Sequence, residues 1–293
     1  MSQSIAFIFP GQGRIPDALP PESKRVASLL DRAEEHGLAL RTWIAEGRRD
    51  LLEQTENAQP ALFLDSQARD EQLRDVGWAP QAVAGHSLGE YGALVCSGVL
   101  TPIDALEAVI ARGRAMRGVE GTMSAILKLE LGVVEELCRE IGDGVCIANH
   151  NGPTQVVVSG EAGAVGTLAE KAQTLGGRSI PLQVSGPFHS PFMLPAQGEL
   201  EPTLRALAFM PPSIAMVSSV TATQLEAPGE LKETLCRQIT SPVRWVDTIT
   251  RLEALGISTA IEVGSGDVLT RLGRRMSTRL RFMTYEEAID ERN

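Results

Sequence analysis

The segment AGHSLGEYGAL (84–94) constrains the fold of this chain more than any other stretch. It overlaps the end of a short apolar run, QAVAG (81–85), which is typical of a buried strand, and it continues into apolar positions at helical spacing. Gly85 and Gly89 flank Ser87, so the pattern G-x-S-x-G falls at the turn between strand and helix. The sequence therefore predicts an α/β layer fold in which Ser87 occupies a strained turn at a helix N-terminus.

Ser87 is either a nucleophile on that turn or an ordinary serine in a glycine-rich bend. The helix N-terminus favours the nucleophile, because its main-chain N–H groups can stabilise an oxyanion. A serine nucleophile needs a base, and the chain has only four histidines. His36 lies in a polar helical stretch, His86 should point away from its neighbour, and His150 belongs to a predicted strand. His189, in a loop flanked by prolines, is the best candidate.

The sequence offers no convincing acid for a Ser-Asp-His triad. An α/β hydrolase places an Asp or Glu between Ser and His along the chain, but Asp104 resembles a helix cap and Asp143 lies in a GDG turn. We therefore expect a Ser-His dyad. The loop PGQG (10–13), after a predicted strand at 5–9, can supply a second oxyanion donor, because its glycines let the main chain approach a bound group.

Short strands and helices alternate along the chain, and the pattern changes near residue 119. Residues 119–185 follow the order β-α-β-β-α-β, which is the ferredoxin-like order. We therefore predict a large α/β domain formed by residues 1–118 and 186–293, with this small domain inserted into it.

Two helices of the large domain have clear start signals. Residues 101–116 open with Thr101 as N-cap and Pro102 at the first helical position. A second helix is expected over 59–73, with Pro60 in its first turn. Further short strands are expected at 178–184, 214–220 and 258–264.

The charge balance argues against one class of function and leaves another open. The 293 residues carry 37 acidic and 27 basic side chains, a net charge of −10, whereas a nucleic-acid binder normally has a basic surface. Five arginines without an acid, at 270–281, form either a solvated helix face or a docking patch for an anionic partner.

Nothing in the sequence indicates a membrane, an export signal, a metal or a cofactor. No apolar run approaches the ~18 residues that span a bilayer, and residues 1–9 lack the basic start of a signal. The four cysteines lie far apart with no C-x-x-C pair, which argues against disulfides and zinc. We therefore expect a cytoplasmic protein.

Eight short motifs are distributed along the chain: FPGQG (9–13), QPAL (59–62), GHSLGEY (85–91), RGRAM (112–116), ANHNGPTQVVVSG (148–160), GPFHSPFM (186–193), SPVRW (241–245) and EVGSGDVL (262–269). They occur in the order seen in malonyl-CoA:acyl carrier protein transacylases, a family that includes the acyltransferase domains of polyketide synthases. The chain resembles this family from about residue 4 to residue 275.

The resemblance implies an α/β-hydrolase-like large domain with a mostly parallel sheet. It also implies ping-pong transfer of a malonyl group from malonyl-CoA to acyl carrier protein. In that reaction Ser87 would carry the acyl group and His189 would be the base. The main-chain N–H groups of Gln12 and Leu88 would hold the oxyanion, and the main-chain carbonyl of Arg244 would orient the base.

The resemblance also changes the interpretation of Arg112. On its predicted helix Arg112 shares a face with Ala105 and Ala108, which by itself indicates a surface arginine. The matching arginine of the family pairs with the free carboxylate of malonate. Phe188 matches malonyl-selective members, in which a bulky ring crowds an α-methyl branch. The other substrate-binding residues implied are Gln59, Met116 and Asn151.

The implied carrier protein is acidic, so basic residues are expected to dock it. The candidates are Arg114, Arg117, Arg271, Arg274 and Arg275. We expect the enzyme to be a monomer.

The chain departs from the family pattern at three places. The segment after Gln12 looks shortened, Arg244 stands where many members have glutamine, and Ser265 and Asp267 stand where proline and lysine are frequent. A stand-alone acyltransferase that serves a polyketide synthase shares every motif and stays an open alternative. The missing triad acid and Arg112 argue against a serine hydrolase such as a thioesterase, and the retained site residues argue against a non-catalytic interaction module.

Overall fold

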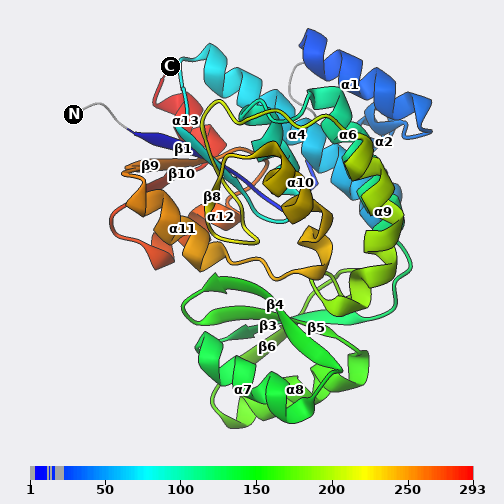
Figure 1. The fold of residues 1–293 in the computed structure, drawn as a ribbon, viewed down its shortest axis with the longest axis vertical. Helices are drawn as coiled ribbons and strands as arrows, with labels where there is room; N and C mark the ends of the chain where they lie inside the picture. Colours follow the sequence, from blue (N-terminus) through cyan, green and yellow to red (C-terminus); the bar gives the residue numbers. More distant parts are fainter. Residues whose placement is uncertain (1–3, 12, 14, 17–22, 293) are drawn as a thin grey trace.

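The computed structural model describes residues 4–11, 13, 15–16 and 23–292, and it contains two β-sheets (Figure 1). A six-stranded sheet, parallel except at one edge, forms the larger body together with most of the helices. A four-stranded antiparallel sheet with two helices forms the smaller body at the bottom of Figure 1. The predicted α/β class with a parallel-rich sheet is confirmed.

The large sheet has the strand order β10-β9-β1-β2-β7-β8. All neighbouring pairs are parallel except β7 with β8. The inner strands β1 and β2 are buried on both faces, and each is a short apolar run without alternation. Two expected strands are shorter than predicted, because only 215–217 and 259–262 pair with neighbours. The bounds are β1 Ile5–Phe9, β2 Ala82–Gly85, β7 Ala215–Val217, β8 Gln224–Leu225, β9 Thr259–Glu262 and β10 Arg281–Met283.

Helices cover both faces of this sheet. Alternate residues of β1 point to opposite sides: Phe7 and Phe9 join one core, and Ala6 and Ile8 join the other. The first core lies against α4, α5 and α6, and the second against α11 and α12. The bounds are α1 Lys24–Glu35, α2 Leu40–Ala45, α3 Arg49–Leu52, α4 Thr55–Asp75, α5 Gly89–Cys96, α6 Pro102–Met116, α9 Leu194–Ala206, α10 Pro228–Cys236, α11 Trp245–Ala254, α12 Val268–Met276 and α13 Tyr285–Asp290, with 3-10 turns η1 Pro191–Met193 and η2 Gln238–Thr240.

The start of α6 is confirmed, and the start of α4 is a correction. Thr101 caps α6 by accepting a hydrogen bond from the Asp104 N–H, with proline at the next position. In contrast, α4 begins four residues before position 59, so Pro60 lies inside the helix and not in its first turn. The helix tolerates this proline because only one carbonyl, that of Glu56, loses its helical donor. The Glu56 backbone packs instead against Gly113 of α6, where an added Cβ would lie 2.9 Å from the Glu56 Cα.

The small sheet has the order β4-β5-β3-β6, and every neighbouring pair is antiparallel. Its elements follow one another in the predicted order, with the last strand ending at 181 and not at 184. Both helices pack on one face and enclose a separate apolar core. The bounds are β3 Thr122–Leu127, α7 Leu131–Ile141, β4 Val145–Gly152, β5 Gln155–Gly160, α8 Ala162–Thr174 and β6 Arg178–Pro181.

The other face of the small sheet belongs to the core of the large body. Met123, Ala125 and Val157 pack into the same apolar cluster as the helices over the large sheet. Main-chain hydrogen bonds add a second link: the Val243 N–H donates to the Ala148 carbonyl at 2.8 Å, and the Val243 carbonyl accepts from His150 at 2.9 Å. The two bodies are therefore joined by packing and by backbone pairing. Within the described ranges, no helix is long and apolar enough to cross a membrane.

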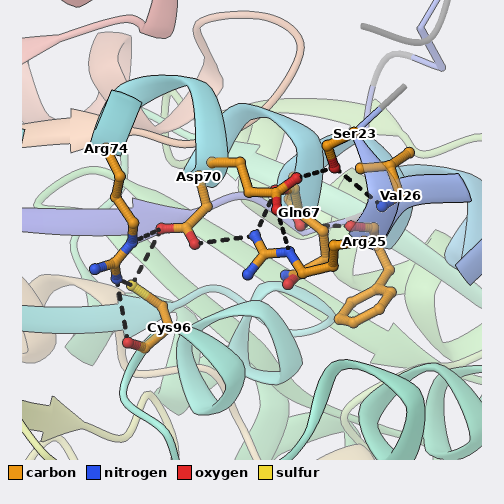
Figure 2. A network of polar contacts seen from close by, with 10 residues as sticks. Ser23, Arg25, Val26, Gln67, Asp70, Arg74 and Cys96 are labelled. Atoms are coloured by element: carbon orange, nitrogen blue, oxygen red, sulfur yellow. Dashed lines mark hydrogen bonds and ion pairs between the residues drawn. The ribbon is translucent and has the colours of Figure 1, made fainter. Parts of the chain in front are cut away.

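A buried polar network ties α1 to α4 and to the end of α5 (Figure 2). Asp70 of α4, 1% exposed, accepts hydrogen bonds from Arg74 Nε at 3.0 Å and from Arg25 Nη2 at 3.3 Å. Arg74 also donates to the sulfur of Cys96 at 2.9 Å. Burial raises the pKa of the Cys96 thiol well above its usual value, so this cysteine stays protonated. The charges of Arg25, Arg74 and Asp70 are thus paired with one another within the chain.

Candidate active site

Ser87 lies on the turn that joins β2 to α5, with a backbone φ of +54°. A non-glycine residue in this left-handed region is strained and is held there by its surroundings. The two motif glycines are required by close packing: an added Cβ would lie 2.1 Å from the Glu90 nitrogen at Gly85 and 2.0 Å from the Phe9 carbonyl oxygen at Gly89. The turn therefore brings α5 directly against β1 and presents Ser87 beyond the end of the strand.

His189 stands next to this serine, with Nε2 2.7 Å from Ser87 Oγ. It is 4% exposed, and its φ of +59° is also left-handed. Its Nδ1 lies 3.1 Å from the main-chain oxygens of both Gln238 and Ser241. Because carbonyl oxygens only accept, Nδ1 carries the proton and Nε2 is left to accept the serine hydroxyl hydrogen.

Burial is the main reason that the pKa of His189 falls to about 3, with the positive charge of Arg112 and the nearby His86 adding to the effect. The imidazole is therefore neutral at ordinary pH, which is the form that can act as a base. Within the described part of the chain, no carboxylate touches the ring, so the pair is a dyad.

The prediction that the Arg244 carbonyl orients the histidine is wrong. Arg244 is the N-cap residue of α11, and its carbonyl oxygen accepts from the Thr248 N–H at 2.9 Å and from the Thr248 hydroxyl at 2.8 Å. The start of the helix thus engages this oxygen, and the carbonyls of Gln238 and Ser241, in and just after η2, take the expected role.

Arg112 is 2% exposed, which contradicts the surface position that its helical face alone suggests. That face, with Ala105 and Ala108, packs inward because α6 crosses α4 closely. Its guanidinium donates to Gln59 Oε1 at 2.6 Å and to Ser87 Oγ at 3.1 Å.

No carboxylate pairs with Arg112 among the residues that the structure describes, and its Nε has no partner there. Burial lowers the pKa of this arginine. A buried cation with only neutral partners is costly for a folded protein, and an anionic ligand would remove that cost.

These side chains meet at a cavity of about 270 Å³ between the two bodies. The small sheet contributes residues from β3, β4 and β5, and the large body contributes the elbow, α6 and α12. Its lining includes Ser87, Arg112, Met116, Met123, Asn151, Val157, Phe188, His189 and Leu272.

The other predicted substrate residues also lie at this cavity. Phe188 and Met116 line it directly, whereas Gln59 is fully buried behind Arg112 and holds its guanidinium. Asn151 reaches across from β4 to His86, with its Oδ1 2.8 Å from His86 Nε2. His86 thus belongs to the site wall, although its position beside the serine had suggested that it points elsewhere.

The predicted oxyanion donors can be placed only in part. Leu88 follows the nucleophile as N-cap of α5, and within the described ranges its N–H donates to no main-chain carbonyl. Gln12 lies outside the described residues. Its neighbour Gly11 packs on the elbow: an added Cβ would lie 2.9 Å from the His86 carbonyl oxygen and 3.5 Å from the Ser87 Cβ.

Two buried residues of the site were missed by the sequence reasoning. Glu90 of α5 is 3% exposed and accepts from the Gln238 side chain at 2.6 Å. A signal for Glu90 existed, since it is an acid within the apolar segment that follows the elbow. Gln238 carries no comparable signal, because its role depends on residues about 150 positions away.

The arginines proposed for docking differ in their surroundings. Three of them form ion pairs, Arg117 with Glu56, Arg271 with Asp267 and Arg274 with Glu287, and Arg114 donates to the His36 carbonyl. Arg275 instead lines a second cavity of about 340 Å³, together with Lys128 and Arg178.

Comparison with known proteins agrees with this geometry. The family model described as an acyl transferase domain matches residues 6–282. The malonyl CoA-acyl carrier protein transacylase of Bacillus subtilis strain 168 is 39% identical, over 97% of this chain and 93% of the relative.

Solved structures extend the comparison. The acyl-carrier-protein S-malonyltransferase of Burkholderia pseudomallei 1710b is 33% identical, with a TM-score of 0.90 and 99% of each chain covered. A malonyl-transacylase in complex with its type II polyketide synthase acyl-carrier protein is 30% identical, with a TM-score of 0.90 over 99% of this chain and 100% of the other. The chain therefore belongs to the malonyl CoA-acyl carrier protein transacylase family and is an acyltransferase.

Proposed function

We propose that this chain transfers a malonyl group from malonyl-CoA to the phosphopantetheine thiol of acyl carrier protein, in two half-reactions. One observation carries the proposal: Ser87 Oγ lies within hydrogen-bond distance of both His189 Nε2 and Arg112 Nη2. A nucleophile, its base and a cation without a carboxylate thus meet at a single atom. The names of the relatives support the same reaction.

In the first half-reaction neutral His189 takes the hydroxyl proton of Ser87, and Oγ attacks the thioester carbonyl carbon. The N–H groups of Leu88 and Gln12 stabilise the negative oxygen that forms. The C–S bond then breaks, and the CoA thiolate receives the proton from His189. In the second half-reaction the carrier-protein thiol gives its proton to His189 and attacks the malonyl-serine ester, which frees Ser87.

Arg112 selects the malonyl group by its free carboxylate. Malonate supplies the negative charge that the buried guanidinium lacks, in a paired geometry for which arginine is suited. An acetyl group leaves Arg112 unpaired, which costs about 1–3 kcal/mol for each buried donor left unsatisfied. Phe188 lines the same cavity, and its ring restricts room for an α-methyl branch.

Carrier-protein docking is assigned to the unpaired cations beside the active site. Lys128, Arg178 and Arg275 line the second cavity, which shares Gln155 and Leu272 with the first. In the described structure none of the three has an acidic partner, although the whole chain carries a net charge of −10. This arrangement favours Arg275 over the ion-paired arginines as the contact for an acidic partner.

The finer fold assignment is part of the proposal. The strand order β4-β5-β3-β6 with antiparallel pairing supports a ferredoxin-like small domain, within the boundaries 119–185. The elbow after β2 supports an α/β-hydrolase-like large domain, formed by 1–118 and 186–293. The proposal also includes a role in fatty-acid synthesis, a cytoplasmic location and a monomeric state. The alternative pathway is supply of malonyl groups to a polyketide synthase.

The test is an adduct measurement by intact-protein mass spectrometry. Incubation with malonyl-CoA should add one malonyl group at Ser87, and acyl carrier protein should remove it faster than water does. The Ser87→Ala variant is the control and should gain no mass. Rapid release of CoA without an adduct, and without dependence on carrier protein, would instead identify a thioesterase.

A further inference from the structure

The loop between β9 and α12, residues 263–267, forms part of one wall of the active-site cavity. Ser265 of this loop lines the cavity, and so do Val268 and Leu272 of the helix that follows. Leu272 also lines the second cavity, where the unpaired cations lie. The position of the loop and of the start of α12 therefore shapes the space that a thioester must enter to reach the nucleophile.

A buried acid of α4 holds this loop. Asp65 is 1% exposed and lines the same cavity, and its Oδ2 accepts from the main-chain N–H of Ser265 at 2.8 Å. Ser265 is one of the positions at which the chain departs from the family pattern, where proline is frequent. Proline has no N–H to donate, so this hydrogen bond depends on the departure.

Arg69, one helical turn after Asp65, completes the contact. Its Nε donates to Asp65 Oδ1 at 3.0 Å, and its Nη2 donates to Ser265 Oγ at 2.9 Å. The guanidinium lies 4.3 Å from the centroid of the Tyr285 ring, which holds it in place from the side of α13. Asp65, Arg69 and Ser265 thus form a closed set of hydrogen bonds, which we call the α4 clamp.

The neighbours of Ser265 on both sides are held by other contacts. Gly264 packs against the loop after β1, where an added Cβ would lie 2.5 Å from Pro10 Cγ. In the first turn of α12, the N–H groups of Leu269 and Thr270 donate to the Glu262 carboxylate at 3.1 and 2.8 Å. The clamp therefore governs the short segment 265–268 and not the loop beside the elbow.

This segment has little else to fix it. Gly266 has a backbone φ of +108°, and a Cβ added there would meet no atom within 4 Å. Val268 is 45% exposed although it lines the cavity, which places it at the mouth. A shift of segment 265–268 would therefore change the mouth of the cavity before it changed the reacting groups.

We infer that Asp65 and Arg69 are positioning residues that hold segment 265–268 as the mouth of the active-site cavity. Their role is to set the affinity for the thioester arm of the substrate, and the rate of acyl transfer itself depends on Ser87 and His189. Among the described residues, no hydrogen bond joins Asp65 or Arg69 to either member of the dyad.

The inference rests on the proposed function, because acylation of Ser87 by malonyl-CoA is its readout. The first two variants are Asp65→Ala and Ser265→Pro, which remove the acceptor and the donor of the same hydrogen bond. In single-turnover acylation, we expect each to raise the half-saturating concentration of malonyl-CoA at least fivefold. The maximal rate at saturation should stay within threefold, a split that general damage to the site would not produce.

The double variant tests whether the two residues act through one contact. Groups that share a contact give non-additive effects. The half-saturating concentration of Asp65→Ala/Ser265→Pro should therefore lie within twofold of the worse single variant. Independent effects would multiply instead, to at least 25-fold for two fivefold changes.

Glu286→Gln is the matched control, because this exposed acid also contacts Arg69, at 3.3 Å, but takes no part in the clamp. Its half-saturating concentration should stay within twofold of that of the unsubstituted enzyme. Ser265→Ala loses the hydroxyl but keeps the main-chain N–H, so it should have less than half the effect of Ser265→Pro. If Asp65→Ala does not fold, the comparison of these two Ser265 variants decides.

The failures of the two proposals are distinguishable. If the unsubstituted enzyme forms no malonyl adduct, the proposed function fails. If it forms the adduct and Ser265→Pro matches Ser265→Ala, the positioning role is overturned. The same holds if the variants lower the maximal rate and leave the half-saturating concentration unchanged, or if the effects of Asp65→Ala and Ser265→Pro multiply.

Discussion

Two buried polar clusters of this protein differ in whether their arginines are paired with an acid. In the α1–α4–α5 network, Arg25 and Arg74 are partly exposed and share the buried carboxylate of Asp70 (Figure 2). At the active site, Arg112 is almost fully buried, and among the described residues its guanidinium donates to the neutral oxygens of Gln59 and Ser87 and lies over the ring of Tyr91. Charges balanced within the chain stabilise the fold, whereas a charge left unbalanced in a cavity indicates a place for a ligand.

We expect the largest effect on activity from substitution of Arg112, the unbalanced charge. Arg112→Met should lower kcat/KM for malonyl-CoA by about 100-fold, because two charged hydrogen bonds to the carboxylate are worth about 3 kcal/mol. Transfer of an acetyl group, measured in parallel, should change little. The free energy of unfolding should stay equal or rise, because an unpaired buried charge has been removed.

An equal loss for malonyl-CoA and acetyl-CoA would mean that Arg112 supports the site only as structure. A clear loss of stability in urea would contradict the claim that its charge is uncompensated in the free protein.

Substitution of Asp70, the balanced charge, should lower stability and leave activity nearly unchanged. Asp70→Asn leaves two arginines without their buried acid and should lower the free energy of unfolding by about 2 kcal/mol, less than for a fully buried pair because both arginines reach solvent. Urea unfolding measures this change. The kcat/KM of the folded enzyme should stay within twofold.

Asp31→Asn is the matched control, since Asp31 pairs with Arg41 on the surface. Its loss should stay below about 1 kcal/mol, as for exposed ion pairs. A similar loss for both variants would remove the distinction between a buried network and an ordinary surface pair.

The buried base predicts a pH effect on stability. The pKa of His189 is about 3 in the folded protein, below the ~6.5 of an unfolded chain, so acid favours the unfolded state. This contribution is complete above about pH 6.5 and is lost as the pH falls toward 3; by pH 5 about 2 kcal/mol of it has been lost. His189→Gln should therefore lose less stability between pH 7.5 and pH 5. Parallel urea curves for the two proteins at both pH values would contradict it.

The smallest predicted effect is a change in the KM for acyl carrier protein, which should differ between an unpaired and a paired surface arginine. Arg275→Glu should raise the KM for acyl carrier protein several-fold, and the effect should shrink in high salt because surface charges are screened. Arg274→Glu, one residue away and paired with Glu287, should have a weaker effect. The KM for malonyl-CoA serves as the internal reference. An equal effect of the two variants, or one independent of salt, would count against the assigned docking face.

Several features of the fold follow from local sequence. The elbow could be recognised because an apolar strand, two glycines and an apolar helix stand within about a dozen residues. His189 could be selected as the base because the chain has only four histidines, whose neighbouring residues differ clearly. The start of α4 could not be read in this way, because Pro60 looks like a start signal and the residues before it are polar; their burial against α6 makes them helical.

By itself, the sequence determined the order of strands and helices, the two motif glycines, the dyad and, by resemblance, the reaction. Side-chain periodicity and turn chemistry act over a few residues, so the strands, the helices and the glycines of the turn can be read from short stretches of sequence. Only the tertiary structure decided that Arg112 is buried without an acid, that Gln238 and Ser241 rather than Arg244 hold the base, and that Glu90 meets Gln238. Those outcomes depend on which groups distant segments bring together and which backbone oxygens the helices have already engaged.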